Sequence, residues 1–438
     1  MQPVAISGDI SQIVNPYRQY MYAYPHKRAY HSLGGVDIRQ HLHHLASNAN
    51  HLYVHLPFCK TKCGFCNLFS ITGAAPSYID EYLNTVERQL QQLGCLSDVQ
   101  TACFSSLVVG GGTPLFLSEQ QLERLFSLVE KHLPLKTDEI YTAIETSPSY
   151  SSDDKLRLIR ARGVNRISLG VQSFVAEELK ILGRTHSVDE AHKALERIKK
   201  ASFDELNVDL IYGIPQQTVE SVCQSVKETL SYQPQEIFIY PLYLKEGTRM
   251  HRLVEGYKDM RLEMYSAVRE QLLTGGYQQT SMRRFTLNGT EQSASCGFDN
   301  VLALGCGGRS YLGNLHFCEP FAVGQQQCKH TVEGYIRQTD FYHATHGYIL
   351  NNNEQKRRYA IRHLLFYTGI DKAAYQSFFG ADVNVDFPFL DELICSGYVV
   401  NRDNCLQLTP QGLALSDYIG PMFISNEVQQ KMDKHRLL

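Results

Sequence analysis

From residue 50 to residue 245, short segments with a β-strand pattern of apolar residues alternate with longer segments whose apolar residues have helical spacing. Short runs rich in β-branched and aromatic residues predict six strands: "LYVHLP", "SSLVVGGG", "EIYTAIET", "RISLGVQS", "LNVDLIYG" and "EIFIYPLYL". The stretches between them, such as "SYIDEYLNTVERQLQQLG" and "SEQQLERLFSLVEKHL", carry apolar residues three and four positions apart, which predicts amphipathic helices. Ser118 and Gln121 form a capping-box pattern at the start of the second of these helices.

Strand–helix alternation of this kind predicts an α/β fold with a parallel sheet and crossover helices. Six units in about 200 residues fit a partial (β/α)6 TIM-like barrel better than a closed barrel of eight units. A doubly wound open sheet is the structural alternative. In both arrangements ligands bind beyond the carboxyl ends of the strands, so we expect the functional residues there.

The pattern changes after about residue 250. A helix that ends at Gly275-Gly276 is followed by Gly-rich loops around "LGCGGRSYLGN", and the C-terminal segment then predicts two helices and a strand pair in a winged-helix-like order. That segment has no dense basic face, so we interpret it as an α+β domain that covers substrate or serves in docking, and not as a DNA-binding domain. The expected divisions are an N-terminal arm (1–50), the partial barrel (51–250), a barrel extension with a Gly-rich linker (251–345) and the winged-helix-like domain (346–438).

Net charge, the lack of a long apolar run and the distribution of cysteines limit the partners and the location that we expect for the protein. The formal net charge is −3, which gives no electrostatic reason to expect nucleic acid or an anionic membrane surface. No export signal and no apolar run long enough for a membrane span is evident, so we expect a cytoplasmic protein. Apart from one dense group, the cysteines are scattered, and we expect most of them to be reduced, buried thiols: Cys95, Cys103, Cys223, Cys296, Cys306, Cys318, Cys328, Cys395 and Cys405.

The dense group comprises Cys59, Cys63 and Cys66, directly after the first predicted strand. Thiolates in a short loop bind zinc or an iron–sulfur cluster. A closed zinc site needs four ligands, commonly in two short-spaced pairs, and no second pair of matching spacing follows. Three cysteines on a 4Fe–4S cluster leave one iron open for a small ligand, as a catalytic cluster requires. A zinc-stabilised interaction protein is the alternative from another functional class.

The C-x3-C-x2-C spacing, preceded by "YVHLPF", resembles the radical S-adenosylmethionine enzymes. More narrowly, it resembles the oxygen-independent coproporphyrinogen III oxidase family and its relatives. Further motifs resemble that family in order and spacing: "GGGTP" at Gly110–Pro114, "IETSP" at Ile144–Pro148, "RISLGVQSF" at Arg166–Phe174, "LGRTH" at Leu182–His186 and "NVDLIYGIP" at Asn207–Pro215. The resemblance is strong over residues 50–245 and weak over the remainder.

The resemblance implies that the three cysteines hold a 4Fe–4S cluster whose open iron binds S-adenosylmethionine. It also implies contacts with this cofactor for a set of residues near the strand ends: Tyr53, Phe65, Gly112, Thr113, Glu145, Gln172, Arg184 and Asp209. Cleavage of the cofactor would give a 5′-deoxyadenosyl radical, which needs a covered, dry site. The implied partners are a small-molecule substrate, with tetrapyrroles among the candidates, and a reduced flavodoxin- or ferredoxin-type electron donor.

Three branches of this family remain open for the chain. Leu68 stands where the coproporphyrinogen oxidases carry a further cysteine, and the His-Asn-Arg-type motif of the haem chaperones is not found. The class C radical methyltransferases bind two S-adenosylmethionine molecules and need a second Gly-rich site. The segment "GCGGRSYLG" at Gly305–Gly313, with Arg309 as a candidate carboxylate partner, could contribute to such a site or could be a tight turn.

Two further features bear on the substrate. The segment "YAYPHKRAY" at Tyr22–Tyr30 combines aromatic and cationic residues, which would suit a flat anionic molecule such as a tetrapyrrole or would pack the arm onto the barrel. His316, His343 and His346 are candidate haem ligands or ordinary surface and core residues. A haem-binding chaperone with little turnover is therefore a further hypothesis, beside an oxidoreductase and a methyltransferase.

Overall fold

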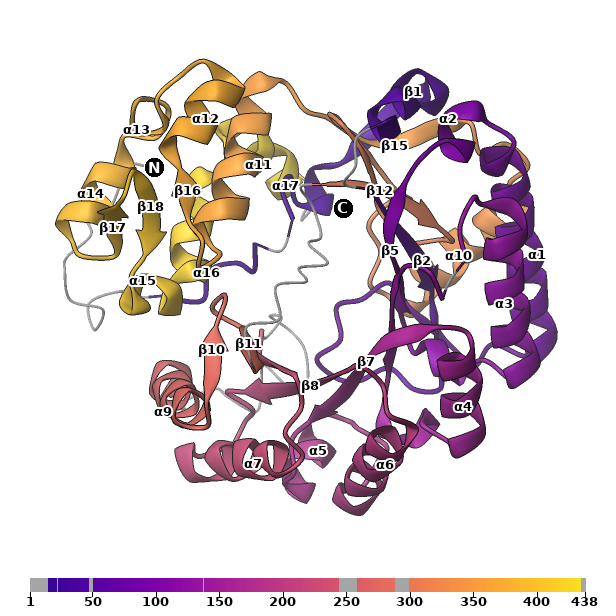
Figure 1. Ribbon diagram of the computed structural model, residues 1–438, viewed down its shortest axis with the longest axis horizontal. Helices are drawn as coiled ribbons and strands as arrows, with labels where there is room; N and C mark the ends of the chain where they lie inside the picture. The colour runs from indigo at the N-terminus through magenta and orange to yellow at the C-terminus, as the bar shows by residue number, and fades with distance from the viewer. Residues whose placement is uncertain are drawn as a thin grey trace.

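A computed structural model describes residues 15–21, 23–46, 50–136, 138–243, 258–287 and 299–434. Tyr22, Cys296 and the expected division at residues 250–251 lie outside these ranges. One curved sheet organises most of the chain, and its strands follow the order β1-β15-β14-β13-β12-β2-β5-β6-β7-β8-β9-β11-β10 (Figure 1).

Six parallel strands in chain order form the centre of this sheet and confirm the predicted (β/α)6 unit. They are β2 (Asn50–Leu56), β5 (Phe104–Gly111), β6 (Tyr141–Thr146), β7 (Val164–Gln172), β8 (Glu205–Tyr212) and β9 (Glu236–Pro241). Each of these strands lies beside the one that follows it in this series, so the strand order runs in a single direction across the sheet, as in a barrel. In a doubly wound sheet the strand order reverses direction at one point. Among the described strands the sheet does not close on itself.

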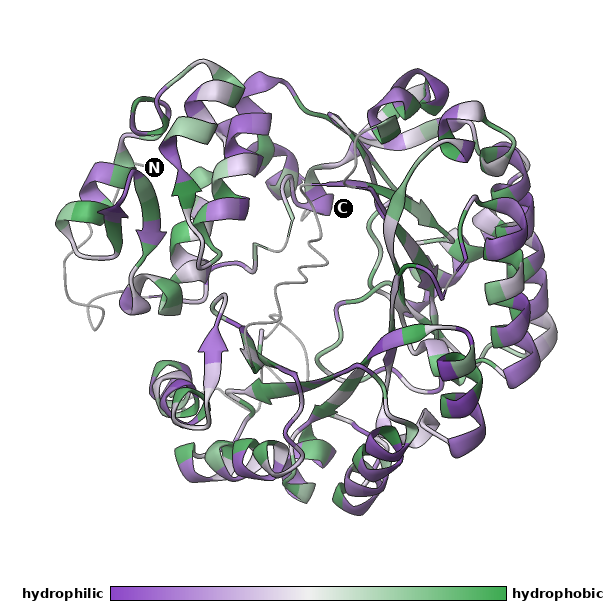
Figure 2. Ribbon diagram, viewed as in Figure 1, coloured by the Kyte–Doolittle hydropathy of each residue, from purple (hydrophilic) through white to green (hydrophobic). Residues whose placement is uncertain are grey.

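The crossover helices line the outside of this central unit (Figure 1). They are α1 (Pro76–Gly94), α3 (Glu119–His132), α4 (Asp153–Ala161), α5 (Ala176–Ile181), α6 (Val188–Ala201) and α7 (Val219–Ser231). Figure 2 shows the mostly hydrophilic outer sides of α1 and α3, whose apolar residues join the strands in the main core. The capping box of α3 is confirmed, because Gln121 N donates to Ser118 Oγ at 3.3 Å and Ser118 N donates to Gln121 Oε1 at 3.1 Å.

Further strands extend the sheet at both edges. On one side β12 (Asn300–Leu304) pairs in parallel with β2, and an antiparallel series continues through β13 (Ser310–Leu312), β14 (Leu315–Phe317), β15 (His343–Ile349) and β1 (His31–Asp37). The other side adds β11 (Arg284–Leu287) and β10 (Tyr277–Gln279), which follow α9 (Arg261–Thr274).

The structure differs here from the sequence expectation, which took the N-terminal arm and the Gly-rich segment as irregular. The arm supplies an edge strand, and the Gly-rich segment supplies a hairpin of the main sheet. Strand β1 is largely exposed and contains two glycines, and β13 and β14 have only three residues each. Strands that are this short or this exposed leave no clear alternation of apolar and polar positions.

The C-terminal segment forms a separate core on the opposite side of the sheet from α1 and α3 (Figure 1). Its helices and strands follow the order expected for a winged helix, with a three-stranded antiparallel sheet in the order β16-β18-β17. The elements are α11 (Asn352–Leu364), β16 (Ile370–Asp371), α12 (Lys372–Phe379), α13 (Val383–Asp386), α14 (Phe389–Cys395), β17 (Val399–Arg402), β18 (Cys405–Leu408), α15 (Pro410–Ala414), α16 (Ser416–Ile419) and α17 (Asn426–Lys434). Tyr24 and Tyr30 of the N-terminal arm belong to this second core.

A buried ion pair joins this C-terminal unit to the main sheet. Arg283, just before β11, donates to Asp417 of α16 and to the hydroxyl of Tyr243, which itself donates to Asp417. The Arg283 guanidinium also lies 3.9 Å from the ring centroid of Tyr20 in the arm. The pair is almost inaccessible to solvent, with side-chain exposures of 7% for Arg283 and 1% for Asp417. Within the described part of the chain, no helix has the length and apolarity to cross a membrane.

Replacing Asp417 by Asn should destabilise the protein strongly, because it leaves the Arg283 guanidinium buried without its counter-charge. The expected loss in free energy of unfolding is about 3–5 kcal/mol. Asp154→Asn provides the control, since Asp154 pairs with Arg157 on the surface and should change stability by less than about 1 kcal/mol. Urea denaturation followed by far-UV circular dichroism measures both, and equal losses would contradict a special role for the buried pair.

Candidate functional site

The carboxyl ends of the parallel strands bring most of the predicted site residues to one edge of the sheet. Tyr53 lies on β2, Glu145 on β6, Gln172 at the end of β7 and Asp209 on β8. Gly112 and Thr113 directly follow β5. Because ligands of such sheets bind at this edge, the placement agrees with the sequence expectation.

The cysteine loop lies against the ends of β2 and β5. Cys59 ends the short strand β3 (Phe58–Cys59), which pairs with β4 (Ile71–Thr72) beyond the loop. Gly112 N donates to the carbonyl of Leu56 and Thr113 N donates to that of Phe58, each at 2.8 Å. These backbone bonds fix the start of the loop to the end of β5.

The segment after α5 holds the other side of the cysteine loop. Gly64 N donates to the carbonyl of Leu182 at 3.0 Å, and Arg184 Nη1 lies 3.3 Å from Cys63 Sγ. On the opposite side, the hydroxyl of Thr113 lies 3.7 Å from Cys59 Sγ. The loop is therefore held between residues from two different strand–helix connections, which the sequence had singled out separately.

The glycines at the end of β5 are required by close approaches. A Cβ atom on Gly112 would lie 2.9 Å from Cys59 Sγ and 2.5 Å from the carbonyl oxygen of Phe58. A Cβ atom on Gly110 would lie 2.9 Å from the carboxyl group of Glu145. Side chains at these positions would collide with the cysteine loop and with Glu145, so glycine allows the end of β5 to approach both closely.

Two carboxyl groups lie within this site, and burial raises the pKa of both. Glu145 accepts a hydrogen bond from Gly111 N at 3.1 Å, and burial raises its pKa to about 7. Burial likewise raises the pKa of Asp209 to about 6, against the opposing hydrogen bonds from Asn207 and Ser168. Their mutual repulsion raises the pKa of Glu145 further. Each carboxyl group is therefore ready to ionise when a cationic group of a ligand binds beside it.

Arg184 and Gln172 supply polar groups between the acids and the thiols. Gln172 adopts a φ of 76°, and Arg184 donates to the carbonyl of Gly170 in the same strand. The Nε atom of Arg184 is buried and has no hydrogen-bond partner among the residues that the structure describes. A buried donor of this kind beside three thiols fits a site that is completed by an anionic or polar ligand.

Tyr53 and Phe65 line opposite parts of the site. The Tyr53 hydroxyl lies 3.2 Å from His55 Nδ1. Phe65 packs against a small apolar cluster of Leu182, Ile211, Ile214 and Leu242. Phe65, a residue of the cysteine loop, thus packs the loop against residues at and beyond the end of β8.

Sequence reasoning missed the residues that orient Asp209. Asn207 Nδ2 donates to Asp209 Oδ1 at 2.8 Å and to Ser168 Oγ at 2.7 Å. Asn207 and Asp209 are two positions apart on β8 and so share one face of the sheet, and Ser168 is the register partner of Asn207 on β7. The period-2 rule applied to the predicted strand would have found Asn207.

The three candidate haem-ligating histidines do not come together in this site. His343 is on the surface, where its Nδ1 lies 2.6 Å from Asp340 Oδ2. His346 is on β15, with its ring 6.4 Å from that of Tyr30, and His316 is buried on β14. Across the described residues, no three His, Cys, Asp or Glu side chains are grouped as ligands of a single metal ion.

Comparison with known proteins agrees with this geometry. The model of the "Radical SAM superfamily" matches residues 53–228. The chain is 31% identical over 277 residues to the "Heme chaperone HemW" of Lactococcus lactis, which covers 61% of this chain and 71% of that protein. It is 27% identical over 435 residues, 92% of each chain, to the "Oxygen-independent coproporphyrinogen III oxidase" of Pseudomonas aeruginosa. The solved coproporphyrinogen III oxidase of Escherichia coli has the same fold, with a TM-score of 0.80 at 23% identity over 96% of this chain and 99% of that one.

Replacing Glu145 by Gln should stabilise the ligand-free protein at pH 8 and have little effect at pH 5. With its pKa raised from 4.5 to about 7, the folded carboxyl group is neutral at pH 5. As the pH rises from about 4.5 through 7, the carboxyl group ionises more readily in the unfolded chain than in the folded protein, so the free energy of unfolding falls. At pH 8 the glutamine, which cannot ionise, should recover about 2 kcal/mol of that free energy.

Urea denaturation at the two pH values measures this difference. Glu177→Gln is the matched control, because Glu177 is an exposed side chain on α5 and should change stability by less than about 0.5 kcal/mol at either pH. Equal stabilisation by E145Q at pH 5 and pH 8 would show that the ionisation of Glu145 is not its cause.

Proposed function

Because the chain belongs to the radical SAM superfamily, in the family that includes the coproporphyrinogen III oxidases and haem chaperones, we propose that it is a radical S-adenosylmethionine enzyme. Cys59, Cys63 and Cys66 would hold a 4Fe–4S cluster, and the residues at the strand ends would bind S-adenosylmethionine. The observation that carries the proposal is the contact of Arg184 with Cys63, because it joins the thiol loop to the polar strand ends in a single site.

Each site residue has a role that its chemistry supports. Glu145 and Asp209 are half-buried carboxyl groups suited to the ammonium group and ribose hydroxyls of the cofactor. Arg184 offers a planar cation for its carboxylate, and Gly112 and Thr113, which bond to the start of the cysteine loop, would contact its amino-acid part. Tyr53, Phe65 and Gln172 would border the adenosine.

A reduced 4Fe–4S cluster supplies the electron that cleaves S-adenosylmethionine to methionine and a 5′-deoxyadenosyl radical. The protein must orient the substrate and exclude water from such a radical. We assign this covering role to the N-terminal arm and the C-terminal unit, which share one apolar core beside the sheet. We further propose a cytoplasmic location, where a flavodoxin- or ferredoxin-type protein would supply the electron.

For the substrate we propose a tetrapyrrole, because the relatives named above act on or carry such molecules by their names. Leu68, which is 51% exposed in the cysteine loop, replaces the additional cysteine of the coproporphyrinogen oxidases. This difference favours a reaction other than decarboxylation of coproporphyrinogen. The second candidate is a methyltransferase that uses two S-adenosylmethionine molecules, since the turn at Gly305–Gly308 lies against His55 and Phe69 beside the cysteine loop. A haem chaperone is the third.

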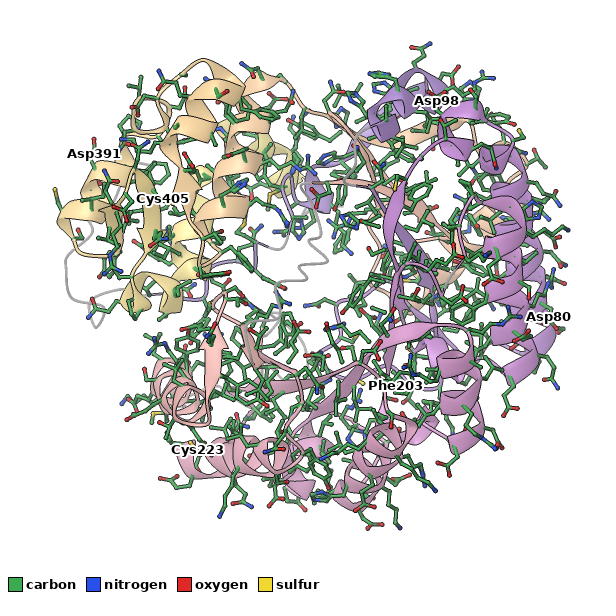
Figure 3. All side chains as sticks on the ribbon, viewed as in Figure 1. Asp80, Asp98, Phe203, Cys223, Asp391 and Cys405 are labelled. Carbon is green, nitrogen blue, oxygen red and sulfur yellow. The ribbon has the colours of Figure 1, made fainter. Side chains whose placement is uncertain are left out.

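Replacing Cys63 by Ala should abolish the iron–sulfur absorbance of the anaerobically reconstituted protein, because two thiolates are too few for a stable cluster of this type. Cys223→Ser is the control, since Cys223 lies on the outer helix α7 (Figure 3). Iron and sulfide analysis should give about four of each per chain for the wild type and the control. Binding of zinc with no iron by the wild type would favour the zinc-stabilised interaction protein instead.

Under strong reductant the wild type should convert S-adenosylmethionine to 5′-deoxyadenosine, and Arg184→Met should slow this at least about tenfold by removing a charged hydrogen bond. Arg157→Met, on the surface of α4, is the control, and cluster content is measured in each variant. S-adenosylhomocysteine as an additional product would identify the methyltransferase. Tight haem binding with no 5′-deoxyadenosine would contradict the enzymatic proposal in favour of a chaperone.

A further inference from the structure

The acidic residue Glu178 is buried outside the site described above. It lies in α5 and is only 4% exposed. Acidic side chains are almost never buried this deeply unless a cation pairs with them. Among the residues that the structure describes, however, Glu178 has no cationic partner, and three uncharged groups donate hydrogen bonds to it instead. The elements that these groups join show what the buried acid does.

The three donors come from two neighbouring strand–helix connections. The hydroxyl of Ser173, which directly follows β7, donates to Glu178 Oε2 at 2.6 Å. Gln217 Nε2, from the connection after β8, donates to the same oxygen at 2.9 Å. The hydroxyl of Ser221, in the first turn of α7, donates to Glu178 Oε1 at 2.6 Å. One carboxyl group therefore joins α5 to the connection between β8 and α7.

Two of these donors are themselves fixed by backbone groups. Gln217 Oε1 accepts from Ile214 N at 3.2 Å, and Gln217 Nε2 also donates to a backbone carbonyl of β8 at 3.3 Å. Ser221 Oγ accepts from Thr218 N at 3.0 Å in the capping box of α7. Because β8 and α7 hold these donors in place, the carboxyl group of Glu178 anchors α5 to both elements.

Helix α5 needs an anchor of this kind. It has 6 residues, and no side chain forms a hydrogen bond at its N-cap. A helix of fewer than two turns has little stability of its own, so its orientation depends on contacts with other elements. Before its first turn, Val175 N donates at 2.9 Å to the Ser173 hydroxyl that donates to Glu178. The hydrogen bonds around Glu178 therefore hold the start of α5 as well as its middle.

The far end of α5 holds the cysteine loop. Leu182 N donates to the carbonyl of Glu178 at 2.9 Å, and the carbonyl of Leu182 accepts from Gly64 N at 3.0 Å. Arg184 N donates to a carbonyl of α5 at 2.9 Å, and Arg184 Nη1 lies 3.3 Å from Cys63 Sγ. The contacts of the loop with this connection are thus about one helical turn from the side chain of Glu178.

We propose that Glu178 is a positioning residue for the cysteine loop: its carboxyl group fixes α5, and α5 sets Leu182 and Arg184 against the loop. This inference rests on the proposed function, because it gives Glu178 an effect on the iron–sulfur cluster that the loop would hold. Hydrogen-bond donors and positive charge beside the cysteine sulfurs favour the reduced cluster, which carries one more negative charge. Glu178 would therefore make the cluster easier to reduce without touching it.

Glu178→Ala removes all three hydrogen bonds and should make the midpoint reduction potential of the anaerobically reconstituted protein more negative, because Arg184 is no longer held against Cys63. The expected shift is about 59 mV, a tenfold change in a one-electron equilibrium. Glu178→Gln, which can still form hydrogen bonds at the same positions, should restore this equilibrium to within about twofold of the wild type. A redox titration followed by electron paramagnetic resonance measures these potentials. Glu177→Ala is the matched control, since Glu177 is exposed on the same helix.

Hydrogen–deuterium exchange of the cluster-free protein tests the positioning without the cluster. Glu178→Ala should speed exchange at least about tenfold in peptides that cover α5 and residues 60–66, because local opening of these segments becomes easier. Exchange in α3, on the far side of the central strands, should not change. Glu178→Gln and Glu177→Ala should both exchange like the wild type.

A wild-type potential in folded Glu178→Ala, or unchanged exchange over residues 60–66, would mean that Glu178 serves the fold alone and would overturn the proposal. Should Glu178→Ala fail to fold, Ser173→Ala, which removes one of the three bonds, should move both readouts in the same direction by a smaller amount. No change in Ser173→Ala would equally overturn the proposal. Failure of the proposed function would appear separately, as absence of 5′-deoxyadenosine from the wild type under strong reductant, and hydrogen exchange would still test the role of Glu178.

Discussion

Two backbone hydrogen bonds between the ends of β2 and β5 place the chemistry of this protein. The amide groups of Gly112 and Thr113 donate to Leu56 and Phe58, so the cysteine loop begins where two parallel strands end. The other contacts of the loop depend on that position. They include the approach of Arg184, which lies in the connection between β7 and β8. A side chain at Gly112 would push Cys59 away from the strand ends, which is why a glycine-rich strand end and a cysteine-rich loop occur together.

Sequence patterns predicted the elements that are buried on both sides. The six central strands are nearly continuous apolar runs, and their polar residues stand at the carboxyl ends, so both the strands and Glu145 or Asp209 could be found from the pattern. The edge strands β1, β13 and β14 were not found, because their short or exposed sequences lack a period. The proximity of Lys27 in the arm to Arg309 was not predictable either. Lys27 and Arg309 were noticed separately, but no local rule states that residues 282 positions apart lie in one place.

The two sides of the site differ in the charged groups that they present. On the side of β6 and β8 it presents two half-buried acids, Glu145 and Asp209, whose pKa values are raised mainly by removal from solvent. On the side of the arm, burial and then the neighbouring arginines lower the pKa values of Lys27 and His316. His55, buried between them, is kept neutral because burial lowers its pKa to about 4. A molecule with an ammonium group at one end and carboxylates at the other would be oriented by this field before any close contact forms.

The ion pair between Arg283 and Asp417 also sets an order of events during synthesis. Tyr20, Tyr243 and Arg283 leave the ribosome before Asp417, so the buried guanidinium has no counter-charge until the C-terminal unit is made. The cysteine loop and the central strands β5 to β9 are complete before that moment. The nascent chain therefore passes through a stage in which the cysteine loop is complete while the Arg283 guanidinium still lacks its counter-charge.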